Sequence, residues 1–531
     1  MDSIKHSREA NHSLTYFSER DQAYMKNPGQ FKNFIDHAPE VDSFSSAIAA
    51  KQASFSSEAR KLLINRLRLQ YDSNEIESPT GLDLLAQENS VAVVTAHQPC
   101  LFTGPLYFIY KIASAIALAR KIENQHPDVK VVPMYVLGNE DHDFEEINHF
   151  RIFGKTLSWE TTQTGAVGAM TLEGVQDLID QLEEMLGTES YAEGIISLLR
   201  KSYQPNFTLT QGTTKFVHGL FGDHGLIVAD LDDPELKKSA SFIFEKEINE
   251  QYSKKLTHDN QSELETLGFS AQIYSRDINL FYLNKGIRER IELVDGELRT
   301  DEFVVTKLGD NGIDTDVITK ISPNVVLRPL YQQYVLPSIA YVGGGAEVAY
   351  WMEINGIFKY LDIPFPMLVR RDSALYINNY VSGLMQKLNL STDEIFTDLH
   401  KAQEFYLKSQ ADADWSLNAI SEAFNSTFND LTEEIKKQDE GLTKMVKGFQ
   451  TQHDNFINKL ESKIKKSIKN QHDVAMGRIE KVWNELFPDR SLQERKDNFI
   501  PIYAKQGPAF ITKLVEAFDP LEIGMHIFIE E

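Results

Sequence analysis

The stretch from Val91 to Lys111, VAVVTAHQPCLFTGPLYFIYK, carries the strongest indication of fold in this chain. Its first four residues are apolar and favour a buried β-strand, and Thr95 to Gly104 then supply hydroxyl, amide, imidazole and thiol groups. We expect a helix directly afterwards, because Thr103 can cap it, Gly104 allows close backbone approach and Pro105 fits a first helical turn. Free N–H groups at a helix start attract anions, so the stretch predicts a small-molecule site.

A second strand of the same kind follows at Val129 to Leu137, VKVVPMYVL, and ends in the polar run Gly138 to Asp143. With the helical segment between them, the two strands predict a βαβ unit and an α/β fold. The carboxyl ends of neighbouring parallel strands share one crevice. Residues near 97 and near 142 are therefore expected to converge.

The composition excludes several classes of protein. The 531 residues contain 54 Lys and Arg against 78 Asp and Glu, and the net charge of −24 opposes binding to nucleic acid. A single cysteine, Cys100, excludes an internal disulfide framework. No apolar run resembles a signal peptide or the roughly 20 residues that span a bilayer, so we expect a cytoplasmic protein without a membrane partner.

The rest of the core has a less regular pattern. Leu226 to Ala229 and Leu280 to Leu283 are strand candidates within a region of insertions at approximately 150–325, and the first 90 residues are mainly helical. Ile339 to Val342 is a further strand that enters a glycine run and a helix, and Pro366 to Val369 is the last core strand. We expect residues 1–380 to form this core.

Residues 381–490 are predicted to form a long helical coiled-coil domain. The apolar residues follow three- and four-residue steps, and such a face is buried either by an antiparallel hairpin or by a second subunit. Residues 491–531 are expected to return to the core. The stripe comprises Phe424, Phe428, Leu431, Ile435, Leu442, Met445, Phe449 and Phe456, followed by Leu460, Ile464, Ile468, Ile479, Val482 and Leu486.

Five groups of residues are candidates for chemistry, and each has a plainer alternative. The Asp141-His142-Asp143 cluster suits general acid/base work or a metal, but also a solvated acidic helix start; without a second ligand cluster, no metal is predicted. His97 is placed to contact a phosphate or carboxylate, although a histidine in a turn is more often structural. Cys100 is expected to be a small apolar side chain rather than a nucleophile.

The other two groups lie in the second half of the chain. Gly343 to Gly345 resembles an anion nest before a helix, and a close-packed turn is the alternative. Arg328 is suited to neutralise a substrate carboxylate, and a surface ion pair is the alternative.

Five motifs in the same order resemble the bacillithiol biosynthesis cysteine-adding enzymes, a family of cysteine ligases, over nearly the whole chain. The motifs are TAHQPCLFTGPLYFIYK at 95–111, GNEDHDFEEINH at 138–149, LRPLYQQYVLP at 327–337, YVGGGAEVAYW at 341–351 and SLQER at 491–495. The resemblance implies a Rossmann-like, nucleotidyltransferase-type core with connecting-peptide insertions, a coiled coil and a homodimer. It also implies that L-cysteine is added to glucosaminyl-malate to form the low-molecular-weight thiol bacillithiol.

The resemblance assigns substrate-binding residues position by position. Ala96, His97 and Cys100 depart from the family pattern Thr-Gly-Gln-Gln-x-Gly-Leu, and Gly345-Ala346 stands in place of Pro-Gly. The matched positions are Thr95, Gln98, Thr103, Gly104, Pro105, Asp141, His142, Asp143, Arg328, Gln332, Gly343, Gly344, Glu347, Tyr350 and Trp351.

The implied reaction joins an amine to a carboxylate, which requires activation of the acid and hence ATP, with ADP or AMP as product. We hypothesise that Arg328 holds a malyl carboxylate, that His142 with Asp143 handles the proton of the incoming cysteine amine and that His97 is also catalytic. A nucleotide contact at Arg495 is a further expectation. Two alternatives stay open: a nucleotidyltransferase or synthetase-like enzyme for another small carboxylate, and a noncatalytic coiled-coil scaffold.

Overall fold

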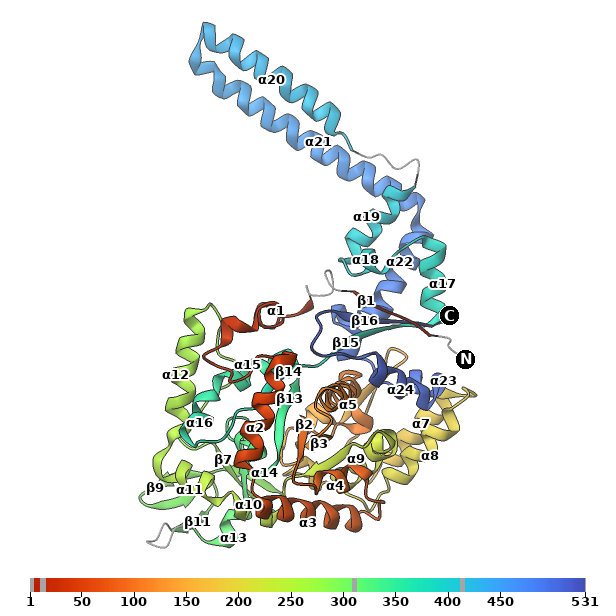
Figure 1. Cartoon of the computed structure of the whole chain (residues 1–531). Coiled ribbons are helices and arrows are strands. Elements are labelled where there is room, and N and C mark those ends of the chain that lie inside the picture. The colour runs from red at the N-terminus through yellow and green to blue at the C-terminus, as the bar shows by residue number, and fades with distance from the viewer. Residues whose placement is uncertain (1–3, 10–15, 308–312, 411–415, 531) are drawn as a thin grey trace. The chain divides into compact units, whose positions relative to one another are not determined.

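A computed structural model describes residues 4–9, 16–307, 313–410 and 416–530 (Figure 1). The chain divides into two compact units. The core unit contains residues 6–375 and 491–527, and the helical unit contains residues 1–5, 376–490 and 528–531. Among the described residues, every helix is too short or too polar to cross a bilayer.

The core unit is built on a five-stranded parallel sheet of order β14-β13-β2-β3-β6. Each of its strands coincides with a segment that the sequence predicts as a strand. The helix α5 (Tyr107–Gln125) links β2 to β3, so the predicted βαβ unit is confirmed. The strands are β2 (Ser90–His97), β3 (Lys130–Leu137), β6 (Ile227–Asp230), β13 (Ser338–Gly343) and β14 (Met367–Arg370).

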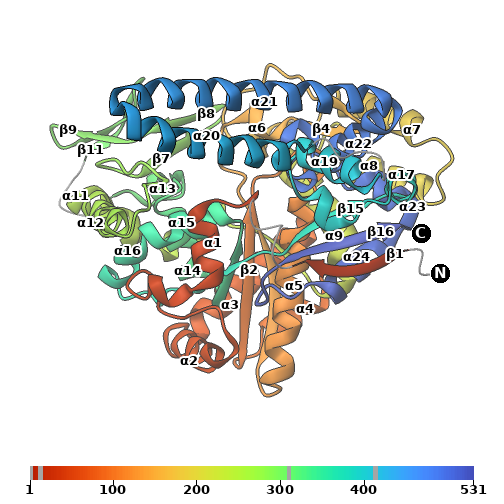
Figure 2. The ribbon, with the colours of Figure 1, turned by 90° about the horizontal axis from the view of Figure 1, so that it is seen from above.

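The two faces of this sheet are covered by different helices because side chains alternate along each strand. Val91 and Val93 of β2 pack with residues of α2 (Phe44–Ser54) and α5. Ala92 and Val94 point to the other face and pack with α3 (Ser57–Ser73) and α4 (Thr80–Leu85). Figure 2 shows α5 beside β2. The strand is therefore buried on both faces, as its apolar run predicts.

The long connections on either side of β6 carry the predicted insertions. The strand expected at Leu280 to Leu283 is β7 (Leu280–Asn284), which lies in a separate antiparallel sheet of order β12-β7-β8. Sequence periodicity alone does not distinguish an added sheet from a core strand. The connection after β3 contains α6 (Phe144–Ile147), the hairpin β4 (His149–Ile152) and β5 (Lys155–Ser158), α7 (Val175–Leu186), α8 (Ala192–Ser202) and α9 (Leu209–Phe221).

The connection after β6 is longer and mixed. It leads to β13, and α15 (Gly345–Glu353) and α16 (Asn355–Tyr360) then link β13 to the edge strand β14. Besides β7, the elements between β6 and β13 are α10 (Pro234–Ser239), α11 (Ser241–Glu250), α12 (Tyr252–Thr266), β8 (Ile287–Arg290), β9 (Glu292–Val294), β10 (Glu297–Arg299), β11 (Val304–Lys307), α13 (Thr315–Ile318), β12 (Ile321–Pro323) and α14 (Arg328–Val335).

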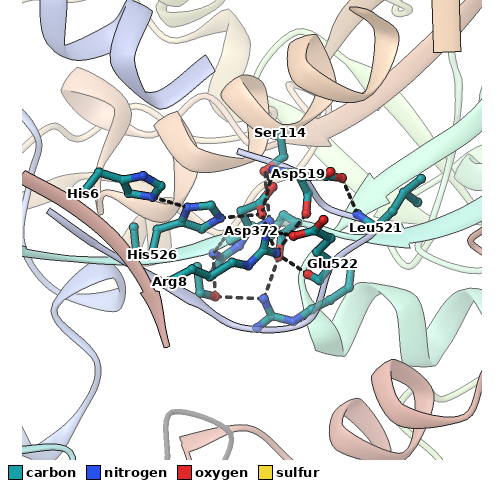
Figure 3. Close-up of polar contacts among 12 residues, drawn as sticks. His6, Arg8, Ser114, Asp372, Asp519, Leu521, Glu522 and His526 are labelled. Carbon is teal, nitrogen blue, oxygen red and sulfur yellow. Dashed lines mark hydrogen bonds and ion pairs between the residues drawn. The ribbon is translucent and has the colours of Figure 1, made fainter. Parts of the chain in front are cut away.

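The segment after the coiled coil packs in the core unit through α23 (Ile500–Gln506) and α24 (Pro508–Ala517). Figure 3 shows the polar contacts that hold its end. His526 Nε2 lies 3.0 Å from Asp372 Oδ1, and Ser114 Oγ of α5 donates a hydrogen bond of 3.0 Å to Asp372 Oδ2. His526 belongs to β16 (Met525–Glu530), which forms a three-stranded sheet with β1 (Ile4–Glu9) and β15 (Ser373–Ile377).

The helical unit contains the predicted coiled coil. Its two long helices, α20 (Asn418–Gln438) and α21 (Thr443–Gln471), form an antiparallel hairpin (Figure 1). Rings of Phe424 and His453 lie 4.3 Å apart across it. The hairpin does not bury the whole apolar face, since Phe449 and Phe456 are 52% and 61% exposed. The other helices are α17 (Asn379–Leu388), α18 (Thr392–Ile395), α19 (Leu399–Ser409) and α22 (Asp473–Leu486); α1 (Glu19–Lys26) belongs to the core unit.

Candidate functional site

The two polar loops after β2 and β3 meet at one edge of the parallel sheet. Gly138 N–H donates a hydrogen bond of 2.8 Å to the His97 carbonyl, and Gln98 Nε2 donates one of 3.0 Å to Asp141 Oδ2. The two loops are about 40 residues apart in sequence, and the register of β2 with β3 aligns His97 with Leu137. The convergence expected from the strand order is therefore present, at the position where open α/β sheets bind ligands.

The loop after β2 has an unusual backbone. Phe102, Thr103 and Gly104 all have positive φ, at 48°, 70° and 59°. A short 3-10 turn, Leu101–Thr103, precedes the helix, and α5 begins only at Tyr107. The prediction that Thr103 caps the helix is wrong, because the turn reverses the chain before the helix begins. Non-glycine residues in this region are strained, so the surrounding structure must hold them.

Asn498, from the segment after the coiled coil, supplies that support. Its buried Nδ2 donates hydrogen bonds to the carbonyls of Phe102 (2.9 Å) and Gly104 (2.6 Å). The backbone N–H of Leu106 donates to the carbonyl of the neighbouring Asp497 at 2.8 Å. Sequence analysis missed Asn498, because nothing in the local pattern around it indicates a contact with residues nearly 400 positions earlier.

Two guanidinium groups lie beside the loop after β3. Arg288 Nη1, from β8, donates to His142 Nδ1 at 2.8 Å and lies 3.4 Å from Asp141 Oδ1. Arg328, the first residue of α14, approaches Gly138 so closely that a Cβ there would lie 3.4 Å from Nη1. Burial acts to raise the pKa of Asp141, but Arg288 and Arg328 hold it below its usual range.

Arg328 differs from Arg288 in having no partner of its own. Within the described ranges, no carboxylate lies within ion-pair distance of its guanidinium and no hydrogen bond of that group is present. A desolvated guanidinium without a carboxylate partner is suited to bind a carboxylate or phosphate in two-point fashion. The site therefore carries more positive charge than Asp141 neutralises. Arg288 itself was missed by sequence analysis, since it is one of several charged residues within an insertion and nothing in the local pattern distinguishes it.

His142 is held by Asp141 rather than by Asp143. Asp141 Oδ1 accepts a hydrogen bond of 2.8 Å from His142 N–H, and it lies 3.4 Å from His142 Nδ1. The side chain of His142 is 54% exposed. Because Arg288 donates to Nδ1, that nitrogen carries no hydrogen in this arrangement, and Nε2 bears the ring hydrogen. Asp143 is exposed and has no described side-chain contact with His142.

His97 is half-buried in the loop after β2. Burial and the nearby Lys111 ammonium lower its pKa to about 4. Its Nδ1 lies 3.1 Å from the Gln98 carbonyl and 3.6 Å from Cys100 Sγ. His97 is thus neutral at physiological pH and does not carry a proton to donate as imidazolium. Burial raises the pKa of Cys100 to about 12, as expected of a small buried side chain that is not a nucleophile.

A largely buried ion pair joins α5 and α15, and a tyrosine of β13 contacts it. Lys111 Nζ lies 2.8 Å from both oxygens of Glu347, and Tyr341 Oη donates to Glu347 Oε2 at 2.6 Å. Burial opposes ionisation, but the Lys111 ammonium holds the pKa of Glu347 below its usual range. Glu347 Oε1 also accepts the Gly344 N–H at 3.2 Å, so part of the anion nest expected there is filled by the chain's own carboxylate.

The remaining predicted residues divide into supporting and site-facing positions. Thr95 is buried and donates to the Val342 carbonyl at 2.7 Å, and Trp351 is a core residue stacked on Tyr341. A Cβ atom added at Gly343 would lie only 3.0 Å from the Cβ atom of Glu347. Tyr350 is half-buried and electrostatically coupled to Arg328.

Three buried groups among the predicted residues lack partners. Thr103 Oγ1, Gln332 Nε2 and Trp351 Nε1 have no hydrogen-bond partner among the described residues. Buried polar atoms are normally satisfied, so such atoms are available to a ligand or to water. Arg495 is exposed, and no side-chain contact between it and the other candidate residues is described. In the described part of the chain, no group of three or more His, Cys, Asp or Glu side chains is arranged to hold a metal ion.

Comparison with known proteins places these observations in a family. The model "Bacillithiol biosynthesis BshC, N-terminal Rossmann-like domain" matches residues 8–372, and "Bacillithiol biosynthesis BshC, C-terminal coiled-coil domain" matches residues 374–530. Both the α/β core and the coiled coil predicted from the sequence agree with these matches.

Relatives described as "Putative cysteine ligase BshC" are similar over nearly their full length. The protein from Christiangramia forsetii is 34% identical over 520 residues, which cover 96% of this chain and 97% of the relative. The protein from Flavobacterium psychrophilum is 34% identical over 516 residues and covers 95% of this chain and 96% of the relative. A solved structure described as an arginyl tRNA synthetase from Campylobacter jejuni has a TM-score of 0.22 at 10% identity, which is too low to carry an argument.

Proposed function

Since the chain belongs to the BshC family of cysteine ligases in bacillithiol biosynthesis, we propose that it joins L-cysteine to glucosaminyl-malate through an amide bond, giving bacillithiol. The observation that carries this proposal is the unpaired Arg328 guanidinium beside Asp141 and Gln98, where the two polar loops meet. A malyl group brings carboxylates that such a guanidinium would hold.

Arg328 would fix the acceptor by one of its malyl carboxylates. Arg288 is engaged with Asp141 and His142, so it orients that loop and leaves Arg328 for the substrate. Thr103 Oγ1 and Gln332 Nε2 would supply further hydrogen bonds to the substrate. Arg288 would therefore have a structural role and Arg328 a binding role.

The amine that attacks must be neutral, so the site needs a group that accepts its proton. His142 is half-exposed, and Asp141 Oδ1 lies 3.4 Å from its Nδ1. We assign the proton to Nδ1 of His142, which would give up its contact with Arg288 on taking the proton and turn to Asp141, so Asp141 takes the supporting position that sequence analysis gave to Asp143. His97, with its pKa lowered to about 4, would act as a neutral hydrogen-bonding group near the reacting carboxylate.

Formation of an amide from a free carboxylate is unfavourable in water, so ATP is proposed as the second substrate that activates the acid. Arg495, with its exposed side chain, remains the proposed nucleotide contact. Purified protein should convert L-cysteine, glucosaminyl-malate and ATP to bacillithiol, detected by mass spectrometry after thiol labelling. A strain without the gene should lose bacillithiol and accumulate glucosaminyl-malate; unchanged bacillithiol would contradict the proposal. The ratio of ADP to AMP identifies the mode of activation.

A homodimer through the coiled coil is also proposed. The hairpin of α20 and α21 leaves a row of large apolar side chains exposed, and such faces are normally covered by a partner. A double change of Phe449 and Phe456 to Glu should convert the dimer to a monomer in light scattering. The exposed residues of the row are Phe424, Leu431, Leu442, Met445, Phe449, Phe456 and Leu460.

A further inference from the structure

A cleft of about 670 Å³ lies beside the carboxyl end of β6, on the edge of the sheet away from β13. We call it the β6 cleft. Its walls come from α3, the loop after β3, the segment at 166–169, α9 and the start of α10. The volume is typical of small-molecule sites. The residues that matter below are Gln70, Asn74, Asn139, Gly168, Thr210 and Asp230.

The wall of this cleft is closely fitted to the loop of the candidate site. Gly168 N–H donates to the Asn139 carbonyl at 2.9 Å, and a Cβ at Gly168 would lie 2.4 Å from both Asn139 Cβ and Thr210 Oγ1. Asn139 Nδ2 in turn donates to Thr210 Oγ1 and Asp230 Oδ1, at 3.2 Å and 2.9 Å. The cleft therefore has a built polar wall that begins two residues before Asp141.

One oxygen of Asp230 is engaged within the protein, and the other is open to the cleft. Oδ1 accepts hydrogen bonds from Asn139 Nδ2 and from Asp232 N–H, each 2.9 Å long. No described residue donates to Oδ2. Burial, together with the neighbouring Asp232 carboxylate, raises the pKa of Asp230 to about 6. Two N–H donors at Oδ1 stabilise the charge of this carboxylate, but among the described residues no cation forms an ion pair with it.

A second acceptor in the cleft is also without a donor. Asn74 is only 7% exposed, lines the cleft and has no partner for its Oδ1, although its Nδ2 donates to the Gln70 carbonyl. Buried amide oxygens are normally hydrogen-bonded. Two acceptors in one cleft therefore lack donors, and they are carried by different elements, α3 and β6.

The cations near the cleft are already engaged. Arg66 pairs with Asp233 at 2.7 Å, and Lys237 pairs with Glu140 at 2.6 Å and also contacts Asp232. Neither contacts Asp230 directly, although the charge of Lys237 acts on it, and Lys215 Nζ donates to the Asn74 backbone carbonyl. A positively charged ligand with N–H donors would supply what Asp230 Oδ2 and Asn74 Oδ1 lack.

We propose that the β6 cleft binds the primary ammonium group of a small polar substrate through Asp230. An ammonium group offers three donors, which suits the free oxygens of a carboxylate and an amide, and Thr210 and Gln70 are suited to hydroxyl groups beside it. The choice of which substrates could carry this ammonium group rests on the proposed function. Both L-cysteine and the amino sugar of glucosaminyl-malate carry a primary amine.

The position of the cleft explains why a ligase would need it. The sheet register aligns His97, Leu137 and Asp230 in one row across β2, β3 and β6. Neighbouring strands are about 4.8 Å apart, so Asp230 lies roughly 10 Å from the row position of His97. One amine is consumed when the amide forms, and the other stays protonated. The cleft would hold the ammonium that does not react, within reach of one substrate molecule.

Binding of matched probes to the full-length protein tests this inference. Isothermal titration at pH 7.5 would compare L-cysteine with 3-mercaptopropionate, and D-glucosamine with D-glucose, so that each pair differs in the amine. We expect at least one amine-bearing probe to bind about tenfold or more tightly than its counterpart. We also expect Asp230→Asn to abolish that preference. The pair of probes that shows this binding preference identifies which substrate supplies the ammonium group.

Two further variants guard against a general effect on folding. Ala169→Trp changes an exposed residue of the rim and should block the cleft while leaving the core intact. Glu235→Gln removes a nearby carboxylate that pairs with Lys238 outside the cleft, and it should bind as the wild type does. The inference is overturned if neither pair shows a preference, or if both Asp230→Asn and Ala169→Trp retain it.

The test is separable from that of the proposed function. If bacillithiol is formed but the amine preference survives both cleft variants, the cleft assignment fails and the ligase assignment stands. If no bacillithiol is formed while the preference depends on Asp230, the ammonium site stands and the ligase assignment fails.

Discussion

The loop after β2 and the loop after β3 end neighbouring parallel strands, yet different forces hold them. The first is a buried turn with three positive φ angles, and amide hydrogen bonds from the distant Asn498 support it. The second is a partly exposed loop fixed by charge, with Arg288 and Arg328 beside Asp141. The first loop therefore fixes the shape of the site, whereas the second carries charges that a bound substrate or a change of protonation can alter.

Replacement of Arg328 by alanine should have the largest effect on activity. It removes the guanidinium that we assign to the substrate, and kcat/KM should fall roughly 100-fold or more. Steady-state kinetics with varied glucosaminyl-malate would measure this. Arg328→Lys keeps the positive charge but lacks the planar guanidinium that binds a carboxylate at two points, so it should recover only part of the activity. Because Arg328 has no described ion pair, the Tm should change little; normal activity in Arg328→Ala would remove it from the binding site.

Replacement of Asn498 by alanine should have the largest effect on stability. It removes two hydrogen bonds that hold a strained turn and leaves two buried carbonyls without donors, at a cost of about 2–4 kcal/mol. Thermal unfolding followed by calorimetry would show the loss. Asn65→Ala, an exposed position on α3, is the matched control. If both variants unfold at the wild-type temperature, the turn is not held by Asn498.

Replacement of Asp141 by asparagine should give a smaller effect that depends on pH. The pKa of Asp141 is lowered in the folded protein, so its carboxylate stabilises the fold above the unfolded pKa of about 4 and loses this effect as the pH falls further. Asp141→Asn should therefore cost about 1 kcal/mol at pH 7 and progressively less below pH 4. Denaturant unfolding at several pH values would measure it; a constant difference would show that charge does not hold this loop.

Replacement of Asp230 by asparagine should change stability least, and in the opposite direction. Its pKa is raised to about 6, so the carboxylate destabilises the fold above that pH and the penalty disappears as the pH falls below about 4. At pH 8, Asp230→Asn should have a slightly higher Tm than the wild type, and its free energy of unfolding should be larger by about 1 kcal/mol. At pH 4 the two proteins should be equally stable. A lower Tm at pH 8 would show that Asp230 is already satisfied without a ligand.

The strands and their order were accessible from local sequence, because each buried strand is a short apolar run with a polar turn at its end. The register of β2 and β3 then brought Gln98 and Asp141 together as expected. The helix start was mispredicted, since Thr103 and Pro105 suit a helical N-terminus locally, while the long-range bonds from Asn498 favour a strained turn instead. The roles of Arg328 and His142 remain predictions.

The sequence by itself determined the α/β core, the heptad pattern of the coiled coil and the five motifs that indicate the family. These depend on periodicity and on short runs of residues, which local physics constrains. Only the tertiary structure decided that Arg288 is engaged with Asp141 and that Trp351 is a core residue. It also decided that, among the described residues, neither Arg328 nor the cleft residue Asp230 has an ion-pair partner. Charge pairing and burial depend on residues hundreds of positions apart, so no local pattern contains them.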